Sequence, residues 1–179
     1  MSAALHTPRL LLREWRDEDR EPFAAMSADP EVIRYLPRLP DRAASDAWID
    51  RMRAHHNEHG FAYWAVELVG EAGLIGAIGL SRVRFPVPFA PAVEVGWRLA
   101  RAYWRQGYAF EAARAAIEDG FFRIGLEEIV AFTVPANRAS WGLMERLGMM
   151  RNPADDFDFP RFPEGHPLRR HILYRLQRP

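Results

Sequence analysis

The segment from residue 93 to residue 149 constrains the fold of this chain most, because four elements of alternating type follow one another there. VEVGWRL (93–99) and LEEIVAFTV (126–134) have the pattern of strands, and a helical pattern follows each. The first helix opens after a glycine turn at Gly107 and the second after Asn137. Glycine at a strand-to-helix turn lets several backbone N–H groups converge on an anion. The segment therefore predicts a site that could hold a pyrophosphate without any charged side chain.

Composition excludes several classes of protein. A length of 179 residues fits one domain spanning 1–179, with enough residues to bury a core. The 24 basic residues balance 24 acidic ones, whereas a protein that binds nucleic acid through its phosphates normally has a basic excess. Arginine and acid also alternate locally, as in residues 13–20. This pattern favours a mixed, solvated surface and argues against a nucleic-acid partner.

The absence of cysteine excludes disulfides, thiolate metal sites and a cysteine-bound acyl intermediate. The first ten residues, MSAALHTPRL, lack the hydrophobic run of a signal peptide, and no apolar stretch is long enough to span a membrane. We therefore expect a soluble, cytoplasmic protein with no membrane contact.

The rest of the chain predicts helices first and antiparallel strands afterwards. Helical patterns cover residues 29–36 and 41–58, and Asp17 is placed to cap an earlier helix. Further strands are expected over residues 9–14, 61–69, 74–83 and 170–176. The proline-rich segment 84–91 must be loop, and residues 151–164 form an ordered but irregular one. The pattern is that of an α+β fold, with α and β elements mixed around one sheet.

The order of elements and the residues at the glycine turn resemble the acyl-CoA-binding core of the GNAT superfamily of N-acetyltransferases. The motifs that carry the resemblance are TPRLLLREW, DPEVIRYL, GLIGAIGL, AVEVGWRL with GYAFEA, and N-x-x-S followed by L-G-M. Within the superfamily, the chain looks like the branch that includes enzymes acetylating the N-termini of ribosomal proteins. The resemblance implies a central, mostly antiparallel, twisted sheet flanked by helices, with acetyl-CoA as co-substrate and no metal.

The superfamily's phosphate loop has a Gln/Arg-x-x-Gly-x-Gly/Ala pattern, and Gly107 and Ala109 stand in its last two fixed places. Trp104 stands in the Gln/Arg place, as is common in the ribosomal-protein branch. An ordinary strand-to-helix turn is the alternative interpretation. The resemblance implies that pyrophosphate binds to Arg105, Gln106, Gly107, Tyr108 and Ala109. It also implies that the pantetheine arm binds to the strand edge of Trp97, Arg98 and Leu99 and to Asn137, which stands at a helix N-cap position.

Glu94 is the candidate general base. In VEVGW it shares a strand face with Gly96 and Arg98, while Val93, Val95 and Trp97 occupy the other face. A carboxylate in an apolar strand is costly unless it is hydrogen-bonded or has a raised pKa, and a raised pKa suits a base. Related enzymes also often use a glutamate on this strand. The alternatives are an exposed edge glutamate or an ion pair with Arg98.

Ser140 is the candidate acid for the departing thiolate, since it lies one turn into the helix that Asn137 opens. Many members of the superfamily use a tyrosine four residues further on, but Met144 occupies that place and cannot donate a proton. The alternative is a thiolate that leaves unassisted or is protonated by water.

The acceptor is an amine that must be neutral to attack. Deprotonating a lysine-like amine at pH 7 costs roughly 4–5 kcal/mol, against about 1 kcal/mol for an α-amine. One glutamate with a water chain therefore suffices for an α-amine. A backbone N–H on the Trp97–Leu99 edge can stabilise the oxyanion, and the lack of cysteine favours direct transfer in a ternary complex.

Three further features have simple structural interpretations. The six histidines lack the spacing of a metal site, including the cluster His55-His56-x-x-His59. The acidic-aromatic run 155–159 could recognise a cationic amine or could form a loop over the sheet. The aromatic residues Trp15, Tyr35, Tyr63 and Trp64 could line an acceptor pocket or belong to the core.

We therefore expect an acetyl-CoA-dependent N-acetyltransferase acting on a primary amine such as a protein N-terminal α-amine. A small-molecule acceptor (an amino acid, a polyamine or an antibiotic) and a non-catalytic acyl-CoA sensor are the alternatives. Strand edges in such folds often pair, which leaves a homodimer open.

Overall fold

The structure is a computed structural model that describes residues 4–179, and one mixed sheet organises it. The strand order is β1-β2-β3-β4-β5-β6-β9-β7, with β8 also paired to β9. Every pairing is antiparallel except that of β5 with β6. The strands are β1 (Leu5–His6), β2 (Leu10–Arg13), β3 (Tyr63–Leu68), β4 (Gly76–Arg82), β5 (Val93–Leu99), β6 (Glu128–Thr133), β7 (Met150–Arg151), β8 (Phe157–Asp158) and β9 (Arg170–Gln177).

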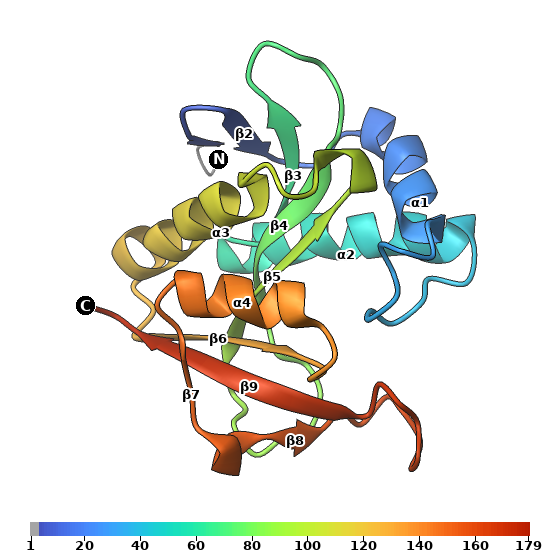
Figure 1. The fold of residues 1–179 in the computed structure, drawn as a ribbon. Coiled ribbons are helices and arrows are strands. Elements are labelled where there is room, and N and C mark those ends of the chain that lie inside the picture. The colour runs from blue at the N-terminus through green and yellow to red at the C-terminus, as the bar shows by residue number, and fades with distance from the viewer. Residues whose placement is uncertain (1–3) are drawn as a thin grey trace.

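Helices cover both faces of this sheet (Figure 1). They are α1 (Arg20–Ala28), α2 (Arg42–His59), α3 (Tyr108–Asp119) and α4 (Arg138–Arg146). Short helical turns occupy Asp17–Asp19, Arg101–Tyr103, Gly120–Ile124 and Pro153–Asp155. This arrangement confirms the expected α+β fold, a mostly antiparallel sheet flanked by helices.

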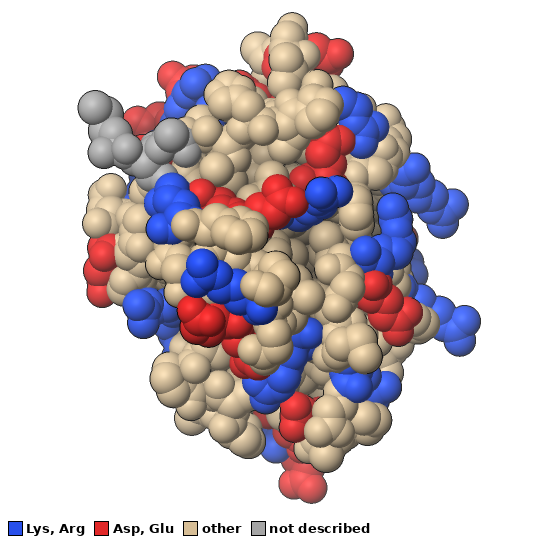
Figure 2. Space-filling model, turned by 90° about the vertical axis from the view of Figure 1, so that its left-hand side faces the viewer, with Lys and Arg blue, Asp and Glu red and all other residues tan. Residues whose placement is uncertain are grey.

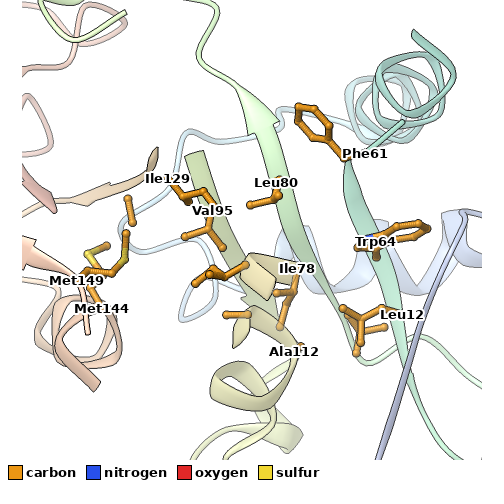
Figure 3. Packing of buried hydrophobic residues seen from close by; sticks show 14 of the residues in the cluster. Leu12, Phe61, Trp64, Ile78, Leu80, Val95, Ala112, Ile129, Met144 and Met149 are labelled. Carbon is orange, nitrogen blue, oxygen red and sulfur yellow. The ribbon is translucent and has the colours of Figure 1, made fainter. Parts of the chain in front are cut away.

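The core on the α3 face is close-packed because this helix presents small side chains to the sheet. Ala112, Ala113 and Ala116 are almost completely buried. Gly120 continues this face, since an added Cβ would lie 2.6 Å from a methyl carbon of Leu80. Figure 3 shows Ala112 among the strand residues of this cluster, which reaches across to the methionines of the α4 region.

The ends of α2 follow the sequence signals closely. The Asp41 carboxylate accepts a hydrogen bond of 2.8 Å from the Ala44 N–H and caps the helix. Gly60 ends it in the left-handed conformation at φ 77°. On the face that α2 covers, Trp48 stacks on Phe23 of α1 with ring centroids 4.7 Å apart.

Residues 29–36 form a helical turn as expected, since the Ile33 N–H bonds to the Asp29 carbonyl at 3.1 Å and the Asp29 carboxylate accepts from the Glu31 N–H at 2.9 Å. One local prediction was wrong. Asp17 is not the cap that opens α1. Its side chain is 77% exposed, and the buried carboxylate nearby is that of Asp19.

Asp19 precedes α1 and forms a buried, bidentate ion pair with Arg13, which holds the start of the helix in place. The guanidinium donates at 2.7 and 2.8 Å, and the Arg16 N–H donates to the same carboxylate at 2.7 Å. We expect Asp19→Ala to lower the free energy of unfolding by about 3 kcal/mol, because it leaves a buried charge without this partner. Urea unfolding measures the change. The control Asp17→Ala should cost far less because its ion pairs are exposed, and equal costs for both variants would contradict this account.

Candidate active-site cleft

The sheet opens between β5 and β6, and this opening positions the candidate site. The two strands pair in register only at Glu94 and Val130, whereas β5 and β4 pair along seven residues. Beyond that point, the carboxyl ends of β5 and β6 diverge. They leave a cleft of about 790 Å³ that is lined from both faces of the sheet. This volume is within the range of small-molecule sites.

The β5 edge that faces the opening has backbone groups without a strand partner. The Ala100 N–H donates to the Ile75 carbonyl. Because hydrogen-bonded and non-hydrogen-bonded pairs alternate in an antiparallel ladder, the backbone N–H and C=O of Arg98 also face β4. By the same alternation, the backbone N–H and C=O groups of Trp97 and Leu99 face the opening. The Leu99 carbonyl accepts a hydrogen bond of 2.8 Å from the Trp104 indole. The N–H and C=O of Trp97 are therefore the best placed of the predicted edge residues to bind an extended arm, whereas the backbone of Arg98 faces the other way.

The loop before α3 presents a run of backbone amides to this cleft. Arg105 and Gly107 both adopt left-handed conformations, at φ 60° and 84°. Among residues 4–179, no protein acceptor bonds to the amides of residues 105–110, and the first such bond is from the Glu111 N–H to the Gly107 carbonyl. Consecutive uncommitted amides at a helix N-terminus form an anion site. This geometry fits the pyrophosphate site expected at Arg105, Gln106, Gly107, Tyr108 and Ala109.

A clamp behind this loop was missed in the sequence. Arg9 donates to the Gln106 carbonyl at 2.9 Å and forms an ion pair of 2.6 Å with Glu111, and its guanidinium lies over the Tyr108 ring. Burial disfavours ionisation of Glu111, but hydrogen bonds from Thr7 and Arg9 outweigh it and lower the carboxyl pKa. Since about a hundred residues separate Arg9 from Glu111, only the fold brings them together. Figure 2 shows that basic and acidic residues lie side by side on the face of the molecule drawn there, in keeping with the expected mixed surface.

Glu94 is half-buried, and it lines the cleft on the face of the sheet that α1 and α2 cover. Within residues 4–179 its carboxylate has neither a hydrogen bond nor an ion-pair partner, so it does not form the alternative pair with Arg98. Burial raises its pKa from 4.5 to about 8, and the charge of Arg161 opposes that shift only in part. A carboxyl with this pKa can take a proton near neutral pH.

Tyr63 is a second residue of this site, and two glycines make room for it. Gly79 of β4 and Gly96 of β5 pair across the sheet, and a Cβ on Gly96 would lie 1.9 Å from the Tyr63 hydroxyl. Burial and then the charge of Glu94 raise the pKa of this phenol well above its usual value, so it stays protonated. Of the four aromatic residues considered as pocket walls, Tyr63 and Tyr35 line the cleft, whereas Trp15 and Trp64 belong to the core.

Asn137 and Ser140 both line the cleft from the start of α4. The Asn137 side chain does not cap the helix. Its amide donates instead to the Thr133 hydroxyl at 3.0 Å. The Ser140 hydroxyl has no hydrogen-bond partner among residues 4–179 and remains available to a ligand. Met144 is 1% exposed and packs in the core, so hydrophobic packing occupies the place where relatives have a tyrosine.

The acidic run 155–159 does not form a cationic-substrate site, because arginines already neutralise its carboxylates. Asp155 pairs with Arg175, and Asp156 and Asp158 also have arginine partners. Phe159 instead stacks on His171, which lines the cleft. Burial lowers the pKa of His171.

The histidine cluster of α2 has a structural role at His55. Its Nδ1 lies 2.7 Å from the Phe61 carbonyl, and its Nε2 accepts from the Arg82 N–H at 3.1 Å. Both ring nitrogens are therefore engaged, and they hold α2 to the segment before β3 and to the end of β4. Within residues 4–179 there is no cluster of three metal-ligating side chains, and no helix has the length and apolar character to cross a bilayer.

Comparison with known proteins identifies the family. The family model for the acetyltransferase (GNAT) domain matches residues 9–150. The chain belongs to the GNAT acetyltransferases. The Bacillus subtilis N-acetyltransferase YnaD is 31% identical over 146 residues, which cover 81% of each chain. A GNAT-family acetyltransferase from Bacillus anthracis is similar in structure, with a TM-score of 0.80 at 26% identity, over 98% of this chain and 99% of the other.

The ribosomal L7/L12 α-N-protein acetyltransferase RimL, solved with coenzyme A, has the same fold, with a TM-score of 0.78 at 14% identity over 98% of both chains. Membership of the GNAT family makes this chain an N-acetyltransferase, an enzyme that transfers an acyl group. The family match also confirms the resemblance to the GNAT superfamily noted from the sequence.

Proposed function

We propose that this GNAT enzyme transfers the acetyl group of acetyl-CoA to a primary α-amine, with a protein N-terminus as acceptor. The observation that carries the proposal is the unpartnered Glu94 carboxyl with a pKa of about 8, in one cleft with the free β5 edge and the uncommitted amides before α3. An α-amine has a pKa of about 7.8, so transfer of its proton to Glu94 is nearly balanced. A lysine side chain, with a pKa of about 10.4, is a poor match.

Different residues of the cleft have different roles in the proposed reaction. The amides of residues 105–110 would hold the pyrophosphate, and the Trp97 edge with Asn137 would hold the pantetheine arm. Acetyl-CoA supplies the thioester. The amine nitrogen forms a bond to the acyl carbon as the C–S bond breaks, and Glu94 takes the proton from nitrogen, directly or through water. A backbone N–H at Trp97 stabilises the oxyanion. Ser140 passes a proton to the thiolate and regains one from solvent, to which Glu94 later releases the proton of the amine.

Comparison of acceptors by release of free thiol from acetyl-CoA tests the proposed α-amine. We expect a peptide with a free N-terminus to react faster than the same peptide with a blocked N-terminus and a lysine side chain. The enzyme itself contains no lysine, so acetylation of its own lysine side chains adds no background. Faster reaction of the blocked, lysine-containing peptide would overturn the α-amine assignment. Thermal stabilisation by acetyl-CoA without turnover of any amine would instead favour a sensor, which the buried Met144 permits.

Ser140→Ala tests the proposed acid. We expect kcat to fall about tenfold, because water can replace the hydroxyl as proton donor at reduced efficiency. The KM for acetyl-CoA should be nearly unchanged, because the proposed role of the hydroxyl is in the transition state and not in binding the co-substrate. Steady-state kinetics measure both constants. An unchanged kcat would assign protonation of the thiolate to water.

A further inference from the structure

The arginines that lack an acidic partner gather at the cleft. The chain has 24 arginines, and 14 of them lie within 4 Å of a carboxylate among residues 4–179. Seven of the other ten line the cleft, whereas only Arg34 and Arg84 of the paired ones do. Among residues 4–179, the acidic residues in the cleft lining are Glu31 and Glu94, and Glu31 is paired with Arg34. The cleft is therefore strongly cationic, although the formal net charge of the whole chain is zero.

These seven arginines fall into two groups. Arg105 and Arg146 lie on the loop before α3 and on α4, where the phosphates of the co-substrate would bind. The remaining five come from other elements that line the cleft, namely the segment before α2, α2 itself, β4, β5 and the segment between β8 and β9. They are Arg38, Arg51, Arg82, Arg98 and Arg161. A cofactor phosphate explains the first group but not the second.

Of the second group, Arg98 has the guanidinium that neighbouring side chains hold most firmly in place. It is half-buried, its guanidinium lies 5.4 and 5.8 Å from the ring centroids of Phe23 and Trp48, and it donates to the Ser27 hydroxyl at 2.9 Å. The aromatic rings and Ser27 fix its position, yet no carboxylate lies within 4 Å of it among residues 4–179. A partly desolvated guanidinium without an anion is costly, and a bound carboxylate would remove that cost.

We propose that Arg98 binds a carboxylate of the acceptor, so that the enzyme selects amines that also carry an acidic group. This inference rests on the proposed function, because Glu94 must receive the amine. Glu94, Gly96 and Arg98 alternate along one face of β5, with the Tyr63 hydroxyl over Gly96 between the two charged groups. Four strand residues span about 13 Å, and the two side chains can lean toward each other across this distance. An acceptor fits with its amine at Glu94 and its carboxylate at Arg98.

Paired acceptors that differ only in the acidic group test this assignment. One pair is a free amino acid and its primary amide, and the other is a short peptide with aspartate or asparagine at its second residue. In at least one pair, we expect the acceptor with the carboxylate to exceed its amide counterpart in kcat/KM by about 10- to 100-fold. The pair that shows this ratio also identifies whether Arg98 binds a main-chain or a side-chain carboxylate of the acceptor. Arg98→Gln should bring that ratio close to one, and Arg98→Lys should keep part of it.

Two controls separate this role from a structural one. Arg114→Gln removes an arginine that pairs with Glu118 on an exposed face of α3, and it should leave the ratio unchanged. The analogue of the preferred acceptor that retains the carboxylate but lacks the amine should compete with the acceptor in the wild type and not in Arg98→Gln. A wild-type ratio near one in both pairs would overturn the inference while leaving the acetyltransferase activity in place. Failure of all four acceptors to react would instead contradict the proposed function.

Discussion

Glu94→Gln should lower kcat/KM for an α-amine acceptor by about 100- to 1,000-fold, the effect of losing a positioned general base. The amide has nearly the same shape as the carboxyl but cannot take the proton of the attacking amine. Acetyl-CoA binding should be unchanged, because the residues proposed to bind the pyrophosphate and the pantetheine arm are other residues of the cleft. Steady-state kinetics and calorimetric titration measure the two effects. Glu118→Gln, an exposed glutamate of α3 outside the cleft, is the matched control and should be fully active.

The pH dependence of the Glu94 variant separates this role from simple damage to the site. In the wild type, activity should rise with pH until the carboxyl of pKa about 8 and the amine have both lost their protons. In Glu94→Gln, only the titration of the amine should remain. Identical pH profiles for the two enzymes would remove Glu94 from the mechanism.

The same carboxyl should make stability depend on pH in a defined direction. Its pKa is higher in the folded protein, about 8 against 4.5, so the folded state holds the extra proton between these values. The free energy of unfolding therefore loses this contribution as pH rises from about 4.5 to about 8, and it changes no further above that. Glu94→Gln does not ionise and should gain stability relative to wild type over this window. Urea unfolding at pH 5 and at pH 8.5 measures the difference.

Gly107→Val should weaken acetyl-CoA binding by about 100-fold, equivalent to losing roughly two hydrogen bonds to a charged ligand. Gly107 has a φ of 84°, a conformation that strains a β-branched residue, and an added Cβ would lie 3.2 Å from the guanidinium of Arg9. The backbone must shift, and the amides that converge on the pyrophosphate would shift with it. Calorimetric titration with acetyl-CoA measures the loss.

The control for this prediction is Gly125→Val. Gly125 is also left-handed, at φ 83°, but no atom among residues 4–179 lies within 4 Å of a Cβ added there. Both substitutions strain the backbone, so both should lower the melting temperature. Only the substitution at Gly107 should weaken the cofactor site. Equal affinity for acetyl-CoA in the two variants would show that the loop before α3 is not where the pyrophosphate binds.

Local sequence signals predicted the elements of this fold but could not predict the contacts that complete the site. Alternation in β5 correctly placed Glu94 and Arg98 on one face, and Gly107 correctly marked the start of α3. The clamp of Arg9 on Glu111 joins the two ends of a long stretch of chain, so no local pattern encodes it. Likewise, the space for Tyr63 depends on the register that pairs Gly79 with Gly96.

The wrong assignments came from residues that satisfy a local rule but have a different partner in three dimensions. Asn137 follows the N-cap preference, yet its amide bonds to Thr133 at the end of β6. The acidic run near Phe159 has the composition of a cation site, but arginines on neighbouring strands take up its carboxylates. In both cases, the competing partner lies on an element whose position only the fold determines.

Release of free thiol from acetyl-CoA, measured with and without an α-amine acceptor at pH 8, tests the central claim most directly. The account predicts release that depends on the acceptor, yields the N-acetylated amine in equal amount, and falls to near the no-amine rate in Glu94→Gln. Acetyl-CoA that stabilises the protein but releases no thiol with any amine, acidic or neutral, would contradict it.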